Sequence, residues 1–500
     1  MKNSPVERRA NRSITRRSLL QRASCVIAAA AFPRSIVLAA ESVSPVTAKL
    51  STYMSEARDR ALPEDVIAKT KEHLLDTIAA MISGSQLPPG RAAIEFARSY
   101  GGEKISTVAA SHILCGPIEA ALANAVLAHS DETDDSHAPS QSHPGCAVVP
   151  AALAVGEKFG VTGTQLVRAV ALGYDIGPRI NMTFGAVDLQ GLGHKSTHSM
   201  AGVFGAAAAA GCAANLNPQQ MRWLLDYSAQ QCSGILAWQR DTEHIEKSFV
   251  FAGMPARSGT TAALLVQSGW TGVADIFSGP DNFLVAFAPR AQAVPDPAGL
   301  IDQLGERYEV TRTNIKKWTV GSPIQAPLDA LENLRKRHPF DSDHVQQLIV
   351  RLATLEAKTV NNREMPDICL QHMMAVMLLD KTASFQAAHD KPRMQDPAIL
   401  RQRAKIQLIA DEELQQRLPR REAVVEITLT DGTHLTERVE AVRCTAENPM
   451  TRDEVVAKSR DLIAPVLGDA TCANLIQKVL GLEDVKDIRE LRPLLSAESS

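Results

Sequence analysis

The segment AHSDETDDSHAPSQSHPGCAVVP, residues 128–150, concentrates more titratable side chains than any other stretch of the chain. Its four carboxylates and three histidines are Asp131, Glu132, Asp134, Asp135, His129, His137 and His143. The segments on either side, 117–128 and 148–159, are small and apolar, and each is predicted to be a helix. The polar segment is therefore expected to be a loop between two buried helices, where a rigid scaffold commonly presents reactive groups.

The crowding of like charges in this loop leaves three interpretations open. Its carboxylates must be solvated, protonated, paired with the histidines or bound to a cation. In the first, the loop is a solvated acidic surface in which Asp134 and Asp135 cap the next helix. In the second it binds a metal, although the spacings match no ligand motif. In the third it performs metal-free acid–base chemistry, with histidine beside carboxylate.

Composition favours a helical protein with a large core. The 500 residues are 45% hydrophobic but only 4% aromatic, and small residues are abundant. This length and composition predict two domains built mostly from closely packed helices. The formal net charge of −3 gives no basic footprint for nucleic acid.

The first 40 residues are predicted to be a twin-arginine export signal. Arg16 and Arg17 precede a modestly apolar run, and small residues suited to cleavage stand at Ala39 and Ala40. The alternative is a frayed basic terminus, because Pro33 and Arg34 interrupt the apolar run. We expect the mature protein to be periplasmic and to have no membrane span. The seven cysteines after Cys25 form no C-x-x-C pair and are expected to be buried thiols.

Helical periodicity extends over most of the chain up to about residue 312. The predicted helices are 62–82, 91–100, 117–128, 148–159, 164–180, 199–214, 219–233 and 256–268. The alanine- and glycine-rich segment 199–214 is apolar all round, so this helix is expected to lie at the centre of the domain.

Strand signals begin after this region. Residues 315–320 and 344–355 are predicted to contain strands, while 327–337 and 368–380 are predicted to be helices. The segments 423–429 and 433–439 alternate by twos around Asp431-Gly432, which predicts a hairpin. The expected organisation is a helical domain made of residues 45–312 and 441–495, with an α+β lid domain, residues 313–440, inserted into it.

Several segments together resemble the MmgE/PrpD family, which includes 2-methylcitrate dehydratase and cis-aconitate decarboxylase. They are Ala128-His129, Asp134-Asp135-Ser136, His143-Pro144-Gly145, the run 148–154, the run 202–208, Lys247, the run 255–259 and the run 269–272. The resemblance extends from about residue 45 to the end of the chain. It implies a mainly α fold, with a large all-helical domain and an inserted smaller α+β lid domain, usually in a homodimer.

The chemistry that the resemblance implies uses no metal and no organic cofactor. It is proton transfer next to a carboxylate of a small di- or tricarboxylate, with loss of water or CO2 or with inversion. We accordingly expect a lyase of the hydro-lyase type. The alternatives are an epimerase or decarboxylase of a similar acid, a metal-dependent hydrolase, and a periplasmic carboxylate-binding protein without catalysis.

The resemblance also marks candidate site residues. The candidate catalytic residues are Asp135, His143, His198, Lys247 and His372. The candidate substrate-binding residues are Glu132, Ser136, His194, Lys316 and Lys317, and no residue is expected to bind a metal. His198 is preferred over His194 because it stands at the start of the alanine-rich helix. Histidines expected after Lys247 and Lys316 are missing, which leaves the substrate open.

Each candidate has a chemical rationale and a structural alternative. The lysines would bind carboxylates and stabilise an enolate-like oxygen, or would be solvated ends of a helix and a strand. A histidine would be the base or the acid because it titrates near neutrality, or would be a satisfied core residue. Asp135 would orient a histidine, or would cap a helix.

Overall fold

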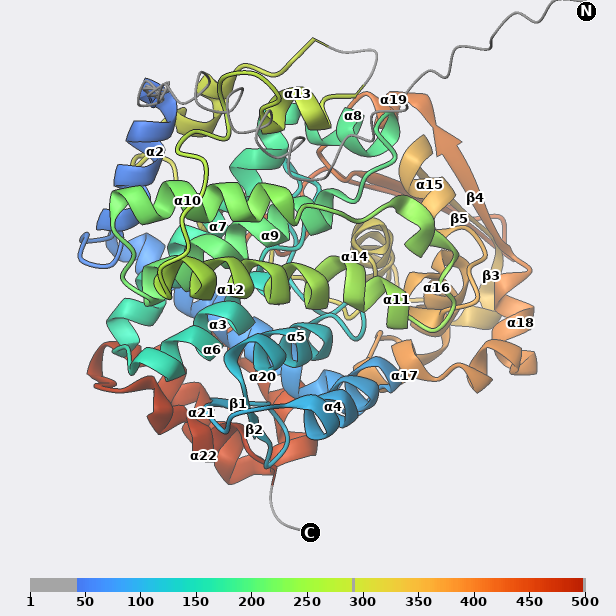
Figure 1. Ribbon diagram of the computed structural model, residues 1–500. Coiled ribbons are helices and arrows are strands. Elements are labelled where there is room, and N and C mark those ends of the chain that lie inside the picture. Colours follow the sequence, from blue (N-terminus) through green and yellow to red (C-terminus); the bar gives the residue numbers. More distant parts are fainter. Residues whose placement is uncertain (1–42, 290–292, 498–500) are drawn as a thin grey trace, which may run out of the picture. The chain divides into compact units, whose positions relative to one another are not determined.

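The computed structural model describes residues 43–289 and 293–497, which contain separate hydrophobic cores in a helical body and a lid (Figure 1). The body core takes residues from 50 to 310 and from 462 to 495, whereas the lid core takes residues from 315 to 455. Body and lid nevertheless belong to one compact unit. The predicted export signal, residues 1–40, lies outside the described residues.

The helical body is defined here as α2–α13 together with α20–α22. Its helices are α2 (Pro45–Glu56), α3 (Glu64–Gly84), α4 (Pro88–Tyr100), α5 (Pro117–Ala128), α6 (Gly145–Phe159), α7 (Gly163–Phe184), α8 (Ala186–Gly191), α9 (Thr197–Ala213), α10 (Pro218–Gln230), α11 (Ile245–Ser248), α12 (Met254–Gln267), α13 (Phe283–Phe287), α20 (Arg452–Leu467), α21 (Asp469–Leu480) and α22 (Arg492–Leu495). A small hairpin, β1 (Ser106–Thr107) with β2 (Leu114–Cys115), precedes α5.

Helix α9 is the centre of the body, as its composition predicts. Every residue of α9 is buried, and the helix packs against α6, α7 and α12. A Cβ on Gly259 of α12 would lie only 2.5 Å from the backbone nitrogen of Ala207 in α9. Small residues are therefore what allow these helix backbones to approach so closely.

Both ends of the described chain meet in the body. Helices α20 and α21 pack against α3, so the last helices, red in Figure 1, lie beside an early blue one. The body is therefore built from residues on both sides of the lid in the sequence.

The lid is defined as α14–α19 with β3–β6. Its elements are α14 (Ser322–Arg337), β3 (Val345–Ala353), α15 (Thr354–Val360), α16 (Leu370–Asp380), α17 (Phe385–His389), α18 (Pro397–Arg403), β4 (Ile406–Asp411), α19 (Glu412–Gln415), β5 (Ala423–Leu429) and β6 (His434–Val439). The sheet order is β4-β3-β5-β6, with β3 and β4 parallel and the other pairs antiparallel. Gly432 has φ 88° in the β5–β6 turn, a conformation that favours glycine.

Most predicted elements are confirmed, but the strand at 315–320 is wrong. Those residues carry no assigned secondary structure, and their apolar side chains Ile315, Trp318 and Val320 pack into the lid core without a partner strand. Strand β4 was not predicted; it pairs with β3 across the α15–α18 crossover.

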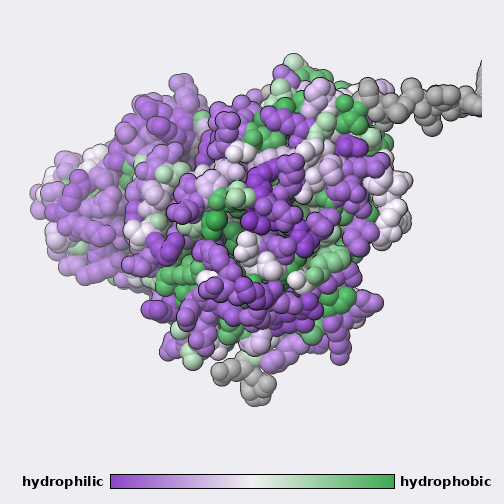
Figure 2. All heavy atoms as spheres, turned by 90° about the vertical axis from the view of Figure 1, so that its left-hand side faces the viewer, coloured by the Kyte–Doolittle hydropathy of each residue, from purple (hydrophilic) through white to green (hydrophobic). Residues whose placement is uncertain are grey.

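Most of the protein's apolar side chains are buried, and this holds for its longest apolar helical run as well. Figure 2 shows hydrophobic residues scattered among hydrophilic ones on the face it presents. The continuous helical run Ile245–Gln267 is long and apolar enough to cross a membrane, but 72% of its most apolar window is buried inside the protein. The seven cysteines of the described residues are free thiols, all buried except the half-buried Cys232.

Candidate active site

The acidic loop connects α5 to α6 and is buried almost throughout. Asp131, Glu132, Asp134 and Asp135 are at most 3% exposed, so the interpretation as a solvated loop is wrong. The backbone of Ser136 exchanges two hydrogen bonds with Asn314, of 3.0 and 2.8 Å, which ties the loop to the segment that leads into the lid. The loop's charged groups must therefore be compensated inside the protein.

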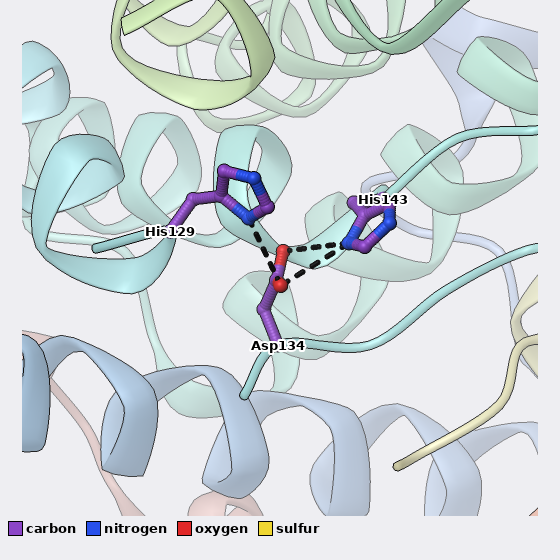
Figure 3. A group of neighbouring side chains, drawn as sticks. All are labelled: His129, Asp134 and His143. Carbon is purple, nitrogen blue, oxygen red and sulfur yellow. Dashed lines mark hydrogen bonds and ion pairs between the residues drawn. The ribbon is translucent and has the colours of Figure 1, made fainter. Parts of the chain in front are cut away.

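Asp134 accepts hydrogen bonds from two histidine rings, which Figure 3 shows. Nδ1 of His129 lies 3.0 Å from Asp134 Oδ1, and Nδ1 of His143 lies 3.1 Å from the same oxygen and 3.2 Å from Oδ2. Because an ionised carboxylate can only accept, each ring donates its Nδ1–H and keeps a lone pair on Nε2. This arrangement fixes the tautomer that a general base needs.

The protonation states agree with this arrangement. Burial lowers the pKa of His143, and lowers that of His129 to about 3, although Asp134 opposes both shifts. Burial alone would raise the pKa of Asp134, but the two histidines outweigh it and hold the pKa well below its usual value. Near neutral pH the group therefore consists of one carboxylate and two neutral imidazoles.

His143 opens onto a cavity of about 100 Å³ between the body and the lid. The body contributes Glu132, Gln141, His143, Gln190, His198, Trp238, Gln239, Lys247 and Phe251 to its lining. The lid contributes Gly321, Ser322, Pro323, Leu355, Glu356, Thr359, Val360, Arg363, Ile368, Leu418 and Arg421. Candidate residues distant in the sequence therefore meet around one small, charged space.

Aromatic rings position the histidine and the lysine of the body. Phe251 stacks on His198 with 3.6 Å between ring centroids, and Trp238 meets Phe251 edge-on at 4.6 Å. Phe251 belongs to a π-helical turn, Phe249–Gly253, a distortion that is frequent at functional sites. Lys247 Nζ lies 5.5 Å from the Trp238 ring and 5.2 Å from the Phe251 ring.

Burial also tunes Lys247 and His198. It lowers the pKa of Lys247 to about 7, whereas the Glu132 carboxylate in direct contact favours the charged ammonium. It lowers the pKa of His198 well below its usual value, and the neighbouring His143 and His129 add to the shift. His198 is therefore a neutral ring beside the cavity.

Glu132 is the central carboxylate of a buried cationic cluster. It contacts Lys247 Nζ directly, lies 3.4 Å from Lys316 Nζ and lies 3.3 Å from His244 Nε2. Lys316 is 1% exposed and also donates to the Glu132 carbonyl oxygen at 2.8 Å. One glutamate thus partly neutralises both predicted site lysines.

A second cavity of about 290 Å³ adjoins the first. Ser322 and Arg421 line both cavities, whereas Ser136 and Lys316 line the second one only. From the second cavity, Lys316 Nζ reaches to 3.4 Å from the Glu132 carboxylate, which lines the first cavity, and to 3.8 Å from Asp134.

Asp135 faces the body core instead of the cavity. It accepts from His73 Nδ1 at 2.7 Å, from the Tyr174 hydroxyl at 2.5 Å and from the Gly145 backbone at 3.0 Å. The histidine that it orients is thus His73 of α3, and the carboxylate beside His143 is its neighbour, Asp134.

Three other candidate residues lie away from the cavity. His194 is exposed. Lys317 pairs with Glu332 at 2.7 Å on the lid. His372 is fully buried in the lid core, and neither of its ring nitrogens has a hydrogen-bond partner among the described residues.

Two groups of side chains have the donor types and spacing to hold a metal ion. They are His129, Asp134 and His143, and His129, Glu132 and His244. In the first group Asp134 already accepts a hydrogen bond from each ring, so its oxygens are occupied by N–H donors. In the second the Lys247 ammonium contacts Glu132 and would repel a cation there. The donor sets therefore fit protons and ammonium groups better than a divalent ion.

Sequence reasoning missed several cavity residues. Trp238, Glu356, Arg363 and Arg421 occupy ordinary-looking segments with no local motif, so only the packing of lid on body brings them to the site. Gly321, where a histidine was expected, lines the cavity and adds no titratable group.

The chain belongs to the MmgE/PrpD family. Residues 48–295 match the MmgE/PrpD N-terminal domain, and residues 318–482 match the MmgE/PrpD C-terminal domain. The two matches cover most of the helical body and of the lid, so the resemblance seen in the sequence motifs is confirmed. The family and the relatives below are enzymes.

Three relatives are similar over nearly their whole length. Cis-aconitate decarboxylase-like protein oryM of Aspergillus oryzae is 26% identical over 479 residues, which cover 91% of this chain and 98% of the relative. Cis-aconitate decarboxylase of Aspergillus terreus is 25% identical over 484 residues, covering 91% and 96%. The human cis-aconitate decarboxylase is 25% identical over 483 residues, covering 91% and 95%.

Proposed function

We propose that this protein is a cofactor-independent lyase that abstracts a proton next to a carboxylate of a small di- or tricarboxylate. The observation that carries the proposal is the pair Asp134–His143, whose histidine lines the same cavity as the cations Lys247, Arg363 and Arg421. A base oriented by a carboxylate, opposite an ammonium group, is what proton removal beside a carboxylate requires.

In the hydro-lyase reaction, His143 is the base and Lys247 the acid. Nε2 of His143 accepts the α-proton, and the electrons of the broken C–H bond form the C=C bond as the C–O bond breaks. The hydroxyl leaves as water with a proton from Lys247, whose pKa of about 7 suits this transfer. Solvent then takes the proton from His143 and returns one to Lys247.

Asp134 and Glu132 support these two roles. Asp134 stabilises the imidazolium that forms on His143 without itself accepting the proton, as its low pKa requires. Glu132 holds Lys247 in the cavity through their direct contact. The aromatic rings of Trp238 and Phe251 exclude water around the ammonium.

Decarboxylation is the second candidate, and the names of the three relatives favour it. In that reaction the C–C bond to one carboxylate breaks, CO2 leaves, the electrons of the bond stay on the remaining carbon, and this carbanion takes a proton from the Lys247 ammonium, which solvent then reprotonates. The same side chains are needed, so the product distinguishes the two reactions.

The test is to incubate the purified protein with a panel of di- and tricarboxylates, saturated, hydroxylated and unsaturated, and to follow products by NMR. We expect one acid to lose water or CO2, and His143→Gln to abolish the reaction. Acids that bind without any turnover, or α-proton exchange without a product, would contradict the lyase and favour the binding protein or the epimerase respectively.

We also propose a periplasmic location and a homodimer. The twin arginines at 16 and 17 support export, and the family resemblance supports a dimer. A fusion of residues 1–40 to a reporter that works only after export tests the first proposal, and light scattering of the purified protein tests the second.

A further inference from the structure

The cations that line the catalytic cavity differ in how they are compensated. Lys247 contacts Glu132, and Arg421 donates to Glu356 at 2.9 Å and to Gln141 at 3.4 Å. Within the described residues, Arg363 has no carboxylate partner, and its guanidinium donates its hydrogen bonds to two backbone carbonyls.

Those two bonds hold the Arg363 guanidinium across the boundary between lid and body. Nη1 donates to the Thr359 carbonyl at the end of α15, at 3.2 Å. Nη2 donates to the Gln239 carbonyl at 2.8 Å, in the 3₁₀ helix Leu236–Arg240 that also carries Trp238. The backbone thus fixes the position of the guanidinium but leaves its charge uncompensated.

We propose that Arg363 binds a carboxylate of the substrate and thereby determines how many carboxylates the substrate carries. The proposal rests on the function proposed above and names a residue of that same cavity. Lys247 is already in contact with Glu132. A second carboxylate of the substrate would therefore bind to Arg363, the cavity cation on the lid that has no carboxylate partner among the described residues.

The geometry of a guanidinium suits this role. Arginine has five N–H donors, and two bonds to carbonyls leave others for a carboxylate, which it can bind through two parallel hydrogen bonds. Arg363 is half-buried at the cavity wall, where such an interaction is less screened than on an open surface.

Arg363 and Lys247 act on the same space. Burial lowers the pKa of Lys247, and the positive charges of Lys316 and Arg363 lower it further. A substrate carboxylate at Arg363 would offset this repulsion and help Lys247 to keep its proton for the leaving group. Binding of a carboxylate to Arg363 on the lid would thus favour the protonated form of Lys247 in the body.

The experiment is a cycle of ligand and residue changes. Calorimetry measures the Kd of tricarballylate, glutarate and butyrate, which carry three, two and one carboxylates, for the full-length protein and for Arg363→Gln. In the wild type we expect at least one lost carboxylate to weaken binding about tenfold to a hundredfold. In Arg363→Gln we expect this difference in Kd between the acids to disappear, while butyrate binds almost as it does to the wild type.

Two further variants separate charge from structure. Arg363→Lys keeps the charge without the paired donors, so we expect it to restore part of the difference in Kd between the acids. Arg401→Gln is the matched control, because Arg401 is an exposed arginine of α18 in the same lid. It should leave all three Kd values unchanged.

Two results would overturn the inference while leaving the proposed function intact. One is an equal weakening of all three acids in Arg363→Gln, which would make Arg363 only a link between lid and body. The other is a set of three Kd values in Arg363→Gln that equals the set in the wild type. If the wild type bound none of the acids, the proposed function would fail together with the inference.

Discussion

Asp134 and Asp135 are adjacent, equally buried, and serve opposite sides of one loop. Asp134 faces the cavity, where it joins His129 and His143, and Asp135 faces the body core, where it joins His73 and Tyr174. Each is 0% exposed, so burial cannot tell them apart. What differs is the cavity that each bonded histidine lines: His143 lines the one that also holds Lys247, whereas His73, 0% exposed, lines a separate cavity of about 70 Å³ whose lining does not include Lys247.

The comparison teaches that a buried histidine–carboxylate pair is not in itself a catalytic site. The cavity-side pair has a neutral ring with Nε2 available, and the ammonium group of Lys247 and residues of the lid line the same cavity. The core-side pair connects α3, α6 and α7 through buried hydrogen bonds. The first should control rate and the second should control stability.

The largest expected effect is the loss of the base. His143→Gln should lower kcat by about 100-fold to 10,000-fold, the range for removing a general acid or base, with little change in melting temperature. Steady-state kinetics and thermal unfolding measure the two quantities. The control is His194→Gln, because His194 is exposed and outside the cavity. Equal activity in the two variants would remove His143 from the mechanism.

Breaking the core-side pair should destabilise the protein. Asp135→Asn leaves three buried donors facing a weaker acceptor, and weakening buried hydrogen bonds to a carboxylate costs about 1.5–3 kcal/mol. Urea unfolding followed by circular dichroism measures the change. A full kcat in the fraction that remains folded is expected; a stable but inactive variant would place Asp135 in the mechanism.

The pH profile should report the cavity-side pair together with Lys247. His143 must be neutral, and burial lowers its pKa, so activity should persist below pH 6.5, the usual histidine value. Lys247 must be protonated, so kcat/KM should fall above its pKa of about 7, by about tenfold per pH unit. The dependence of kcat/KM on pH is measured in a series of buffers at constant ionic strength. A profile that is flat from pH 6 to 9 would contradict the acid role of Lys247.

A third pair, between lid and body, should give the smallest effect. Nε2 of His389 lies 3.0 Å from Asp131 Oδ2, within ion-pair distance, and Nδ1 donates to the Phe385 carbonyl at 2.6 Å, so this environment favours the protonated ring. Burial would lower the pKa of His389, but Asp131 raises it above the usual value. The stabilisation is therefore full below pH 6.5 and is lost as the pH rises through the raised pKa.

His389→Gln measures that contribution. We expect the variant to lose about 1–2 kcal/mol at pH 6 and to approach the wild type at pH 9, by urea unfolding at both values. A loss that is the same at both pH values would show that His389 acts by packing alone.

The sequence predicts the architecture well because its signals are local. Periodicity locates α3, α5 and α9, and the Asp431-Gly432 turn locates the β5–β6 hairpin. The strand at 315–320 was wrong because buried apolar residues such as Trp318 and Val320, spaced by two, also occur in a segment that packs without a partner strand. The strand β4 was missed because its six residues gain their role from the parallel partner β3.

The site was only partly predictable for a different reason. His143, His198, Lys247 and Glu132 stand in recognisable motifs, and all four line the cavity. The choice between Asp134 and Asp135 depends on which way the loop backbone turns each side chain, and no local signal records that. Arg363 reaches the site only through the packing of lid on body.

The most direct test of the account compares Asp134→Asn with Asp135→Asn by α-proton exchange. Each purified variant is incubated in heavy water with a carboxylic acid that the wild type turns over, and proton NMR follows the loss of the α-proton signal per folded molecule. Asp134→Asn should slow the exchange at least about 100-fold because His143 loses its fixed tautomer, while Asp135→Asn should exchange at nearly the wild-type rate. Similar rates for Asp134→Asn and the wild type would contradict the assignment of Asp134 and His143 as the proton-transfer pair.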